Sequence, residues 1–154
     1  MLAIVPISIR DAQAFVRAHH RHAPVVVGAR LAIGLEADGV LIGVGMLGRP
    51  VSRELDADRL CGEAVRVCVI PDAPKGASSK ISARLKRIWQ LMGGVRFVSY
   101  NRADESGASM RGAGLTPMAK VPGRQWSCKS RPRALAPDVV DKTRWEQSLE
   151  RIPP

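Results

Sequence analysis

Apolar residues occur along the chain in two patterns, short continuous runs and helical spacing, and these patterns predict strands and helices respectively. Short apolar runs typical of strands lie at residues 2–7, 31–35, 40–47, 62–71 and 95–101. Apolar residues at helical spacing predict helices over residues 8–19 and from Ser78 or Ser79 to Met92, and a short helix within "DESGASMRGAGL" (104–115). After residue 116, the sequence predicts short strands around Met118 and Trp126 and then a helix over residues 138–150.

The order of these elements indicates the fold class. Asp38-Gly39 separates two apolar runs and is a strong signal for a hairpin turn. The predicted order is therefore β-α-β-β-β-α-β-α-β, an α/β (α+β) mixed sheet with helices on both faces. We expect one domain over residues 1–154, with its core in 2–118 and a basic C-terminal extension, 119–154, that packs on the core.

The composition limits the cellular compartments and the classes of binding partner that we expect. No apolar run approaches the roughly 18–20 residues that a membrane helix needs, the N-terminus reads as a strand and not as a signal peptide, and we expect no membrane partner. The three cysteines are odd in number and lack CxxC spacing, so we expect no disulfide framework and a reducing cytoplasm. We expect either a monomer or a homodimer. The net charge of +10 indicates attraction to a polyanion: nucleic acid, a phosphorylated cofactor or an acidic membrane surface.

The segment "VRVCVIPDAPKGASSKI" (65–81) has the character of a phosphate site. A strand enters a loop of small residues, and a helix then begins, so main-chain N–H groups and the helix N-terminus favour an anion there. Lys75 and Lys80 add positive charge. The segment is neither a Walker loop nor a dinucleotide fingerprint, and an ordinary strand–helix turn is the alternative.

The succession of "VRVCV", "PKGASS", Tyr100-Asn101 and "SMRGAGL" resembles the GNAT family of N-acyltransferases. The resemblance spans most of residues 2–118. It looks closest to small GNAT-like proteins of phages and integrated elements, and it is distantly similar to Mom-type proteins that modify adenine in DNA. The segments shared with that subgroup are the HHxH-type histidines, "GRPV" (48–51), Glu63 with "RVC" (66–68), "SGAS" (106–109) and "SRPR" (130–133). Met110 and Leu115 stand where the family often has a general-acid tyrosine and an aromatic residue.

The resemblance implies a donor site for acetyl-CoA or another acyl-CoA, in a wedge between the fourth and fifth strands. The residues that it assigns to the donor are Val67, Cys68, Val69, Lys75, Gly76, Ala77, Ser78, Ser79, Asn101 and Ser106. Capping of the short helix is the alternative for Ser106. Cys68 in mid-strand is otherwise a small buried hydrophobe.

The candidate catalytic residues are His20, Glu63, Arg66, Tyr100 and Ser109. Glu63 stands where the family often has a general base, which the reaction needs to deprotonate an amine. Strict strand alternation predicts Glu63 on one face and Arg66 on the other. Tyr100, the only tyrosine, ends a strand and either donates a proton or stacks on a base. A solvated strand end, an ion pair and a half-buried aromatic are the structural alternatives for Glu63, Arg66 and Tyr100.

All three histidines lie within "AHHRHAP" (18–24). A metal site made of His19, His20 and His22 is one alternative, although such tight spacing seldom presents three ligands to one ion. Two other roles remain open. One imidazole, for which we choose His20, acts as an acid or base or contacts the acceptor, or the histidines stabilise a helix C-terminus as cations. We therefore expect no metal.

The segment "KVPGRQWSCKSRPR" (120–133) contains five Lys or Arg, no acidic residue and a central tryptophan, which favours nucleic acid. The residues predicted to contact nucleic acid are His22, Arg49, Arg124, Trp126, Lys129, Arg131 and Arg133. The leading hypothesis is thus a GNAT-like acyltransferase of phage or mobile-element type that acts on an amine, with Mom-like modification of a DNA base favoured. The alternatives are an N-acetyltransferase for a small amine or protein, and an inactive nucleic-acid binder with the same fold.

Overall fold

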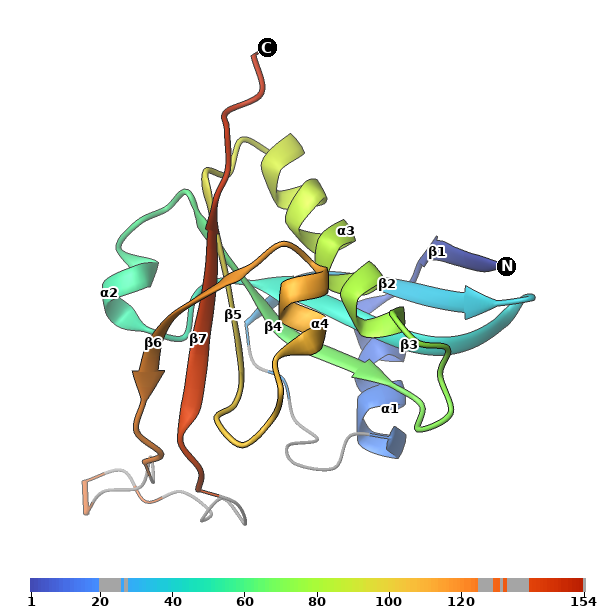
Figure 1. Cartoon of the computed structure of the whole chain (residues 1–154), viewed down its shortest axis with the longest axis horizontal. Coiled ribbons are helices and arrows are strands. Elements are labelled where there is room, and N and C mark those ends of the chain that lie inside the picture. Colours follow the sequence, from blue (N-terminus) through green and yellow to red (C-terminus); the bar gives the residue numbers. More distant parts are fainter. Residues whose placement is uncertain (20–25, 27, 125–128, 131, 133–138, 154) are drawn as a thin grey trace.

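The computed structural model describes residues 1–19, 26, 28–124, 129–130, 132 and 139–153. One seven-stranded sheet forms the centre, in the order β1-β2-β3-β4-β5-β7-β6 (Figure 1). Its strands are β1 (Leu2–Pro6), β2 (Ala29–Ala37), β3 (Val40–Gly48), β4 (Cys61–Val69), β5 (Arg96–Arg102), β6 (Thr116–Val121) and β7 (Lys142–Ser148). The helices are α1 (Ile9–His19), α2 (Arg53–Asp56), α3 (Ala77–Leu91) and α4 (Ala108–Gly112).

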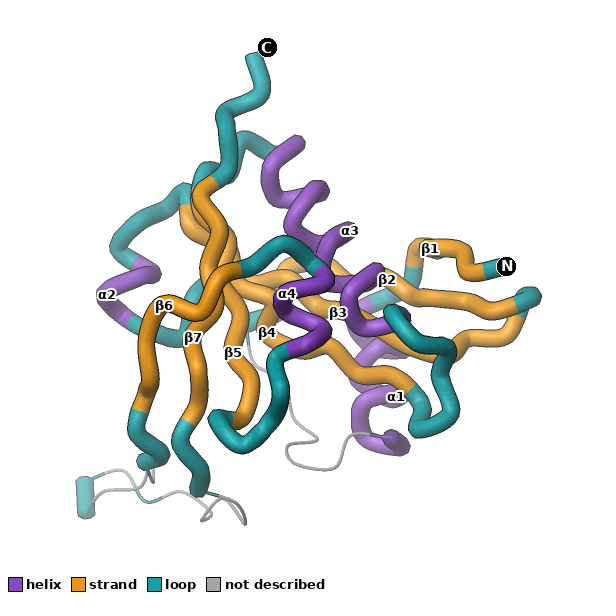
Figure 2. Tube along the Cα trace, viewed as in Figure 1, coloured by secondary structure: helices purple, strands orange, loops and turns teal. Residues whose placement is uncertain are grey.

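Helices cover both faces of the sheet, as the hydrophobic pattern predicts (Figure 2). On one face, Ile81 and Leu85 of α3 and Met110 of α4 pack in the main core cluster. On the other face, Ala12 and Val16 of α1 pack with Val44 and other residues in a second cluster. Among the described residues, no helix is long and apolar enough to span a membrane.

Glycines in the central strands allow α3 to lie very close to the sheet. A Cβ atom at Gly45 of β3 would overlap the side chain of Ile81, and one at Gly62 of β4 would lie 2.7 Å from the Trp89 ring. A larger residue at either position would push the helix away from the sheet. The contact between Gly45 and Ile81 lies near the N-terminus of α3, whereas the contact between Gly62 and Trp89 lies near its C-terminus.

The strands β4 and β5 form the one parallel pair among the described strands, and they separate soon after they meet. They pair only at Cys61–Arg96, Gly62–Phe97 and Glu63–Val98. Beyond Glu63 and Val98 they diverge, as Figure 1 shows, and leave a wedge in the middle of the sheet. We call the region between the two diverging main chains the β4–β5 wedge.

The prediction of a helix over residues 138–150 is wrong, because Lys142–Ser148 is the strand β7. It lies between β5 and β6 and pairs antiparallel with both, so two neighbours satisfy its main chain. Part of the expected C-terminal extension is therefore an inner strand of the sheet. The strand expected around Met118 is confirmed as β6, whereas the one expected around Trp126 lies outside the described residues.

Candidate active site

A β-bulge in β4 determines which residues face the site. Opposite β3, Met46 pairs with Arg66 and Leu47 pairs with Ala64, so Val65 is an extra residue in β4. A bulge restarts the alternation of side chains. Glu63 is opposite Gly48 and Arg66 is opposite Met46, and these β3 residues are two apart and share a face. The expectation that Glu63 and Arg66 lie on opposite faces is therefore wrong.

Glu63 is buried where the β4–β5 wedge begins. Its side chain is 5% exposed, and Oε2 accepts a hydrogen bond of 2.9 Å from the main-chain N–H of Val51. Burial raises the pKa of Glu63 to about 7, and the Val51 N–H and the positive charge of Lys142 oppose that rise. A carboxyl group with this pKa can exchange a proton at neutral pH.

Tyr100 lies on the same face as Glu63. In β5 it is two residues beyond Val98, which pairs with Glu63. Burial raises the pKa of Tyr100, and the nearby charge of Glu63 raises it further. The charge of Arg144, and a hydrogen bond that its guanidinium donates to the Tyr100 oxygen, lower this pKa. Glu63 and Tyr100 are therefore two titratable side chains on the face of the sheet that carries α1 and α2, and the charge of one acts on the other.

Sequence reasoning missed Arg144, because residues 138–150 were expected to be helical. Arg144 is directly opposite Tyr100 in the pairing of β5 with β7. Its Nε lies 2.7 Å from Oε1 of Glu146, and Arg96 forms a second ion pair with Glu146 at 2.9 Å. The alternation of "KTRWEQS" (142–148) is the signal that could have identified this strand.

Main-chain groups of both strands face the β4–β5 wedge. The N–H of Ile70 donates to the carbonyl of Ile42 in the preceding hairpin strand, so by alternation the main chain of Val67 and Val69 points away from β3 and into the wedge. Arg96 N–H donates toward the β4 side, to Leu60, so the main chain of Tyr100 also faces the wedge. Unpaired strands of this kind can bind an extended ligand between them.

Cys68 does not face the wedge, which differs from its predicted role in donor binding. The same alternation directs its main chain toward β3, and its side chain is 5% exposed within the cluster beneath α1. Burial raises the pKa of its thiol. Cys68 is a small buried hydrophobe, the alternative that its mid-strand position suggested.

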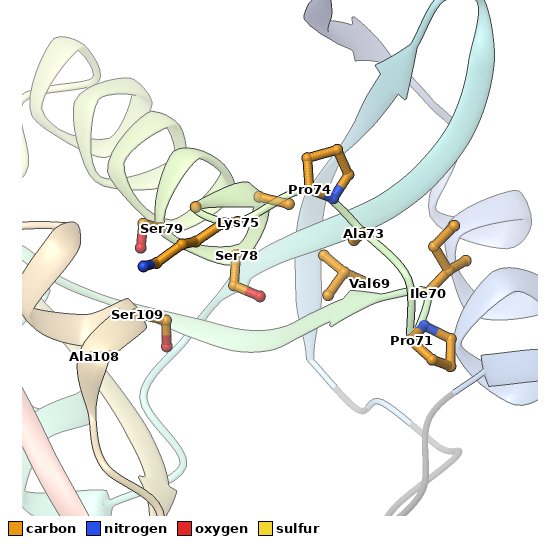
Figure 3. A pocket seen from close by; sticks show the side chains of 12 residues that line it. Val69, Ile70, Pro71, Ala73, Pro74, Lys75, Ser78, Ser79, Ala108 and Ser109 are labelled. Atoms are coloured by element: carbon orange, nitrogen blue, oxygen red, sulfur yellow. The ribbon is translucent and has the colours of Figure 1, made fainter.

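A pocket of about 360 Å³ lies at the N-terminus of α3, beside the wedge (Figure 3). Its walls are the end of β4, the loop that follows, the first turn of α3 and the start of α4. The lining includes the predicted residues Val69, Lys75, Gly76, Ala77, Ser78, Ser79 and Ser109. Gly76 caps α3 with a φ of +89°, a conformation that favours glycine.

This pocket has the features of an anion site. The first N–H groups of an α-helix have no partner within the helix and carry partial positive charge, and α3 has no acidic residue in its first turn. Ser109 belongs to this pocket, on the α4 side of the sheet, and so lies apart from Glu63 and Tyr100. Lys80 does not line the pocket, and its Nζ donates to the carbonyl of Leu2 in β1 at 2.7 Å.

Two further predicted donor residues lie near α4. Asn101 Oδ1 accepts a hydrogen bond of 2.8 Å from Trp145 Nε1. Ser106 Oγ accepts from the N–H of Ala108 at 3.3 Å, which is the capping role held open as its alternative. Met110 is 8% exposed and belongs to the core, so its side chain serves the packing of α4.

The structure describes only part of the predicted histidine and nucleic-acid residues. His19 is exposed and packs on Phe15 with 4.4 Å between ring centroids. Arg49 forms hydrogen bonds with both carboxylate oxygens of Asp56, which neutralises its charge. Arg124 and Lys129 are exposed. The predicted residues outside the described part are His20, His22, Trp126, Arg131 and Arg133. Within the described part, no group of three His, Cys, Asp or Glu side chains could hold a metal ion.

Comparison with known proteins identifies the architecture. The sequence matches no family model and no curated protein, but many solved structures share its fold. The ribosomal-protein-S18-alanine N-acetyltransferase of Escherichia coli superposes with a TM-score of 0.68 at 14% identity, over 99% of this chain and 97% of that one. The chain has the fold of GNAT N-acetyltransferases.

Two other structures with this fold agree over nearly their whole length. An N-acetyltransferase of Staphylococcus aureus Mu50 has a TM-score of 0.69 at 14% identity, over 97% of this chain and 99% of that one. The protein yncA from Salmonella typhimurium, solved with its cofactor acetyl-CoA, has a TM-score of 0.68 at 21% identity, over 98% of this chain and 95% of that one. The GNAT fold therefore includes β6 and β7 and is not confined to the expected core of residues 2–118.

Proposed function

We propose that the protein is an acyltransferase that transfers an acyl group from acetyl-CoA, or another acyl-CoA, to an amine. The observation that carries the proposal is the position of Glu63. Its carboxyl group, with a pKa of about 7, is buried where the β4–β5 wedge begins. A base with this pKa can take a proton from an attacking amine at neutral pH.

The wedge and its neighbouring pocket fit a CoA donor. The N-terminus of α3 favours a pyrophosphate, and Lys75, Ser78 and Ser79 line the pocket there. The main-chain groups of Val67, Val69 and Tyr100 can bond the amide groups of a pantetheine arm. A protein with the same fold holds acetyl-CoA, which supports this assignment.

The chain's own residues would supply base, acid and oxyanion contacts. Acyl-CoA supplies an acyl group already activated as a thioester. The Glu63 carboxylate accepts the proton that the amine loses as its nitrogen bonds to the acyl carbon. Main-chain N–H groups of β4 stabilise negative charge on the acyl oxygen. Tyr100 is the candidate to donate a proton to the leaving thiolate, in place of the tyrosine that Met110 replaces.

We favour nucleic acid as the acceptor, with a Mom-like amino group of a DNA base as the target. Lys142 is close enough for its charge to act on Glu63, and β7 pairs it with Val121 of β6. The same hairpin carries the exposed cations Lys120, Arg124 and Lys129. Cations beside the acceptor side of the site would bind phosphates, and a base within a duplex would have to be flipped out of its stack.

One experiment tests donor, base and acceptor together. Purified protein is incubated with isotopically labelled acetyl-CoA and either duplex DNA, single-stranded DNA, RNA or a panel of small amines and peptides, and products are identified by mass spectrometry. We expect a labelled nucleoside with the wild type and a rate roughly 10²- to 10⁴-fold lower with Glu63→Gln. Arg151→Gln, a change of an exposed residue near the C-terminus, is the matched control. Labelled small amines or peptides without a labelled nucleoside would overturn the nucleic-acid acceptor, and no labelled product at all would overturn the proposed reaction.

A further inference from the structure

A hydrogen bond between a buried tryptophan and the candidate donor residue Asn101 fixes the orientation of an amide group. The indole Nε1 of Trp145 lies 2.8 Å from Oδ1 of Asn101. An indole N–H can only donate, so the oxygen of the amide must face Trp145 and its NH₂ must face elsewhere. Trp145 is 4% exposed, which shields this bond from competing water.

The indole ring cannot easily turn away from Asn101, because α4 and its N-terminus hold it. A Cβ atom at Gly107 would lie 2.6 Å from Cη2 of the ring, so only glycine allows the chain to pass this close. Gly107 has a φ of +71°, which also favours glycine. The guanidinium of Arg111 lies 5.5 Å from the centroid of the Trp145 ring, within reach of a cation–π interaction.

Asn101 occupies the part of β5 that borders the wedge. It is three residues beyond Val98, the last β5 residue paired with β4. Since it alternates with Tyr100, its side chain is on the α3 and α4 face, whereas Tyr100 is on the face of α1 and α2. This face of the sheet also carries the pocket at the start of α3, which Ala108 and Ser109 of α4 help to line.

We propose that Trp145 is a positioning residue for the donor: its indole N–H holds the Asn101 oxygen, so that the Asn101 NH₂ is presented to a carbonyl of the acyl-CoA in the β4–β5 wedge. This inference rests on the proposed function, because it needs an acyl-CoA in the wedge. An amide that is held in one orientation binds its ligand without first losing rotational freedom. Trp145 acts only through Asn101 and does not itself touch the donor.

The test measures CoA affinity by isothermal titration calorimetry in a double-mutant cycle. Trp145→Phe keeps an aromatic ring under α4 and removes the N–H, and we expect it to weaken CoA binding roughly three- to tenfold, the effect of one neutral hydrogen bond. Asn101→Ala should weaken binding by a similar factor and leaves the indole in place. The double variant should be no weaker than Asn101→Ala alone. With acyl-CoA varied, KM should rise with little change in kcat.

Trp89→Phe is the matched control. The Trp89 indole N–H donates to the carbonyls of Leu60 and Arg96, each at 3.0 Å, and so supports the fold away from the pocket. This variant should lower the melting temperature and leave CoA affinity within twofold of the wild type. If it weakened CoA binding as much as Trp145→Phe does, loss of packing would explain both effects and the inference would be overturned.

The remaining outcomes separate this inference from the proposed function. If the wild type does not bind CoA, the proposed donor is wrong and the inference fails with it. If the wild type binds CoA and Asn101→Ala binds equally well, the positioning role alone is overturned, even if Trp145→Phe does not fold. If Trp145→Phe weakens binding as much in the Asn101→Ala background as alone, the ring acts through α4 and not through the amide, which also overturns the inference.

Discussion

In the proposed reaction, the raised pKa of Glu63 favours proton transfer near neutral pH, whereas the same shift lowers the stability of the fold as pH rises. Glu63 is a buried acidic residue on the face of the sheet that carries α1 and α2. Its raised pKa of about 7 means that its charged form is rare below neutral pH. We expect kcat/KM to increase as pH rises through about 7, as Glu63 loses its proton. A pH–rate profile with saturating acyl-CoA measures this. A profile that rises at the same pH in Glu63→Gln would assign the titration to another group.

The raised pKa of Glu63 also predicts that the stability of the protein decreases as pH rises. The carboxyl titrates near 4.5 when unfolded and near 7 when folded, so between these values the folded state binds more protons and its free energy of unfolding decreases as pH rises. The decrease is about 1.4 kcal/mol per pH unit, or about 3 kcal/mol in all. Glu63→Gln, which keeps an oxygen for the Val51 N–H, should remove this dependence and exceed the wild type in stability at pH 8.

Urea unfolding at pH 5 and pH 8 checks this prediction in both proteins. Both should be similarly stable at pH 5, where most folded wild-type molecules have a neutral Glu63. An identical loss of stability in wild type and Glu63→Gln between the two pH values would contradict it.

Tyr100 provides a direct spectroscopic test of the site, because it is the only tyrosine in the chain. Its pKa is raised by burial and by the charge of Glu63, and lowered by Arg144. Glu63→Gln should therefore lower the pKa of Tyr100, and Arg144→Gln should raise it. The absorbance of the tyrosinate ion measures both shifts, and Arg151→Gln should leave the pKa unchanged. A Tyr100 pKa that is insensitive to Glu63 would show that the two groups do not interact.

At the scale of elements, the bulge in β4 and the glycines of β3 position the site. Val65, the extra residue, turns Glu63 and Arg66 to one face, and Gly45 lets α3 approach the sheet. A Cβ atom at Gly45 would also lie 3.0 Å from Cδ1 of Leu85. We expect Gly45→Ala to lower the free energy of unfolding by about 1–3 kcal/mol through overpacking. Displacement of α3 should weaken CoA binding as well.

Val40→Ala is the control for this prediction, since Val40 is in the same strand but 65% exposed. It should change the free energy of unfolding by less than about 0.5 kcal/mol. Urea unfolding measures both variants. A Gly45→Ala variant as stable as Val40→Ala would mean that the sheet and α3 are not in rigid contact.

At the scale of the whole molecule, the net charge of +10 predicts binding to a polyanion. If the hairpin of β6 and β7 contacts phosphates, duplex DNA binding should weaken as salt increases. Arg124→Ala and Lys129→Ala together should reduce the slope of log K against log salt by about 0.9 for each phosphate that the variant no longer neutralises. Fluorescence anisotropy at several salt concentrations measures this. A slope equal to that of a Lys80→Ala, Arg84→Ala control on α3 would place the phosphate-binding surface elsewhere.

The order of the elements was largely predictable because local patterns determine them. Alternating apolar runs and the Asp38-Gly39 turn predicted the hairpin of β2 and β3, and a helical stripe with Gly93-Gly94 behind it predicted α3. The strand β7 was missed, because the alternation of charged residues in "KTRWEQS" (142–148) is a weak local signal. Its main chain is stabilised by pairing with β5 and β6, which are distant in sequence from it, and a helical spacing of its few apolar residues was equally compatible with the local pattern.

The sequence by itself determined the chemical groups and their approximate places: a loop of small residues before α3, a glutamate at the start of β4, a tyrosine at the end of β5 and an excess of positive charge. Only the tertiary structure decided which of these groups meet. The bulge at Val65 brings Glu63 and Arg66 to one face, β7 adds Arg144 and Trp145, and burial changes the Glu63 pKa. These are effects of long-range pairing and desolvation, which no local pattern of residues encodes.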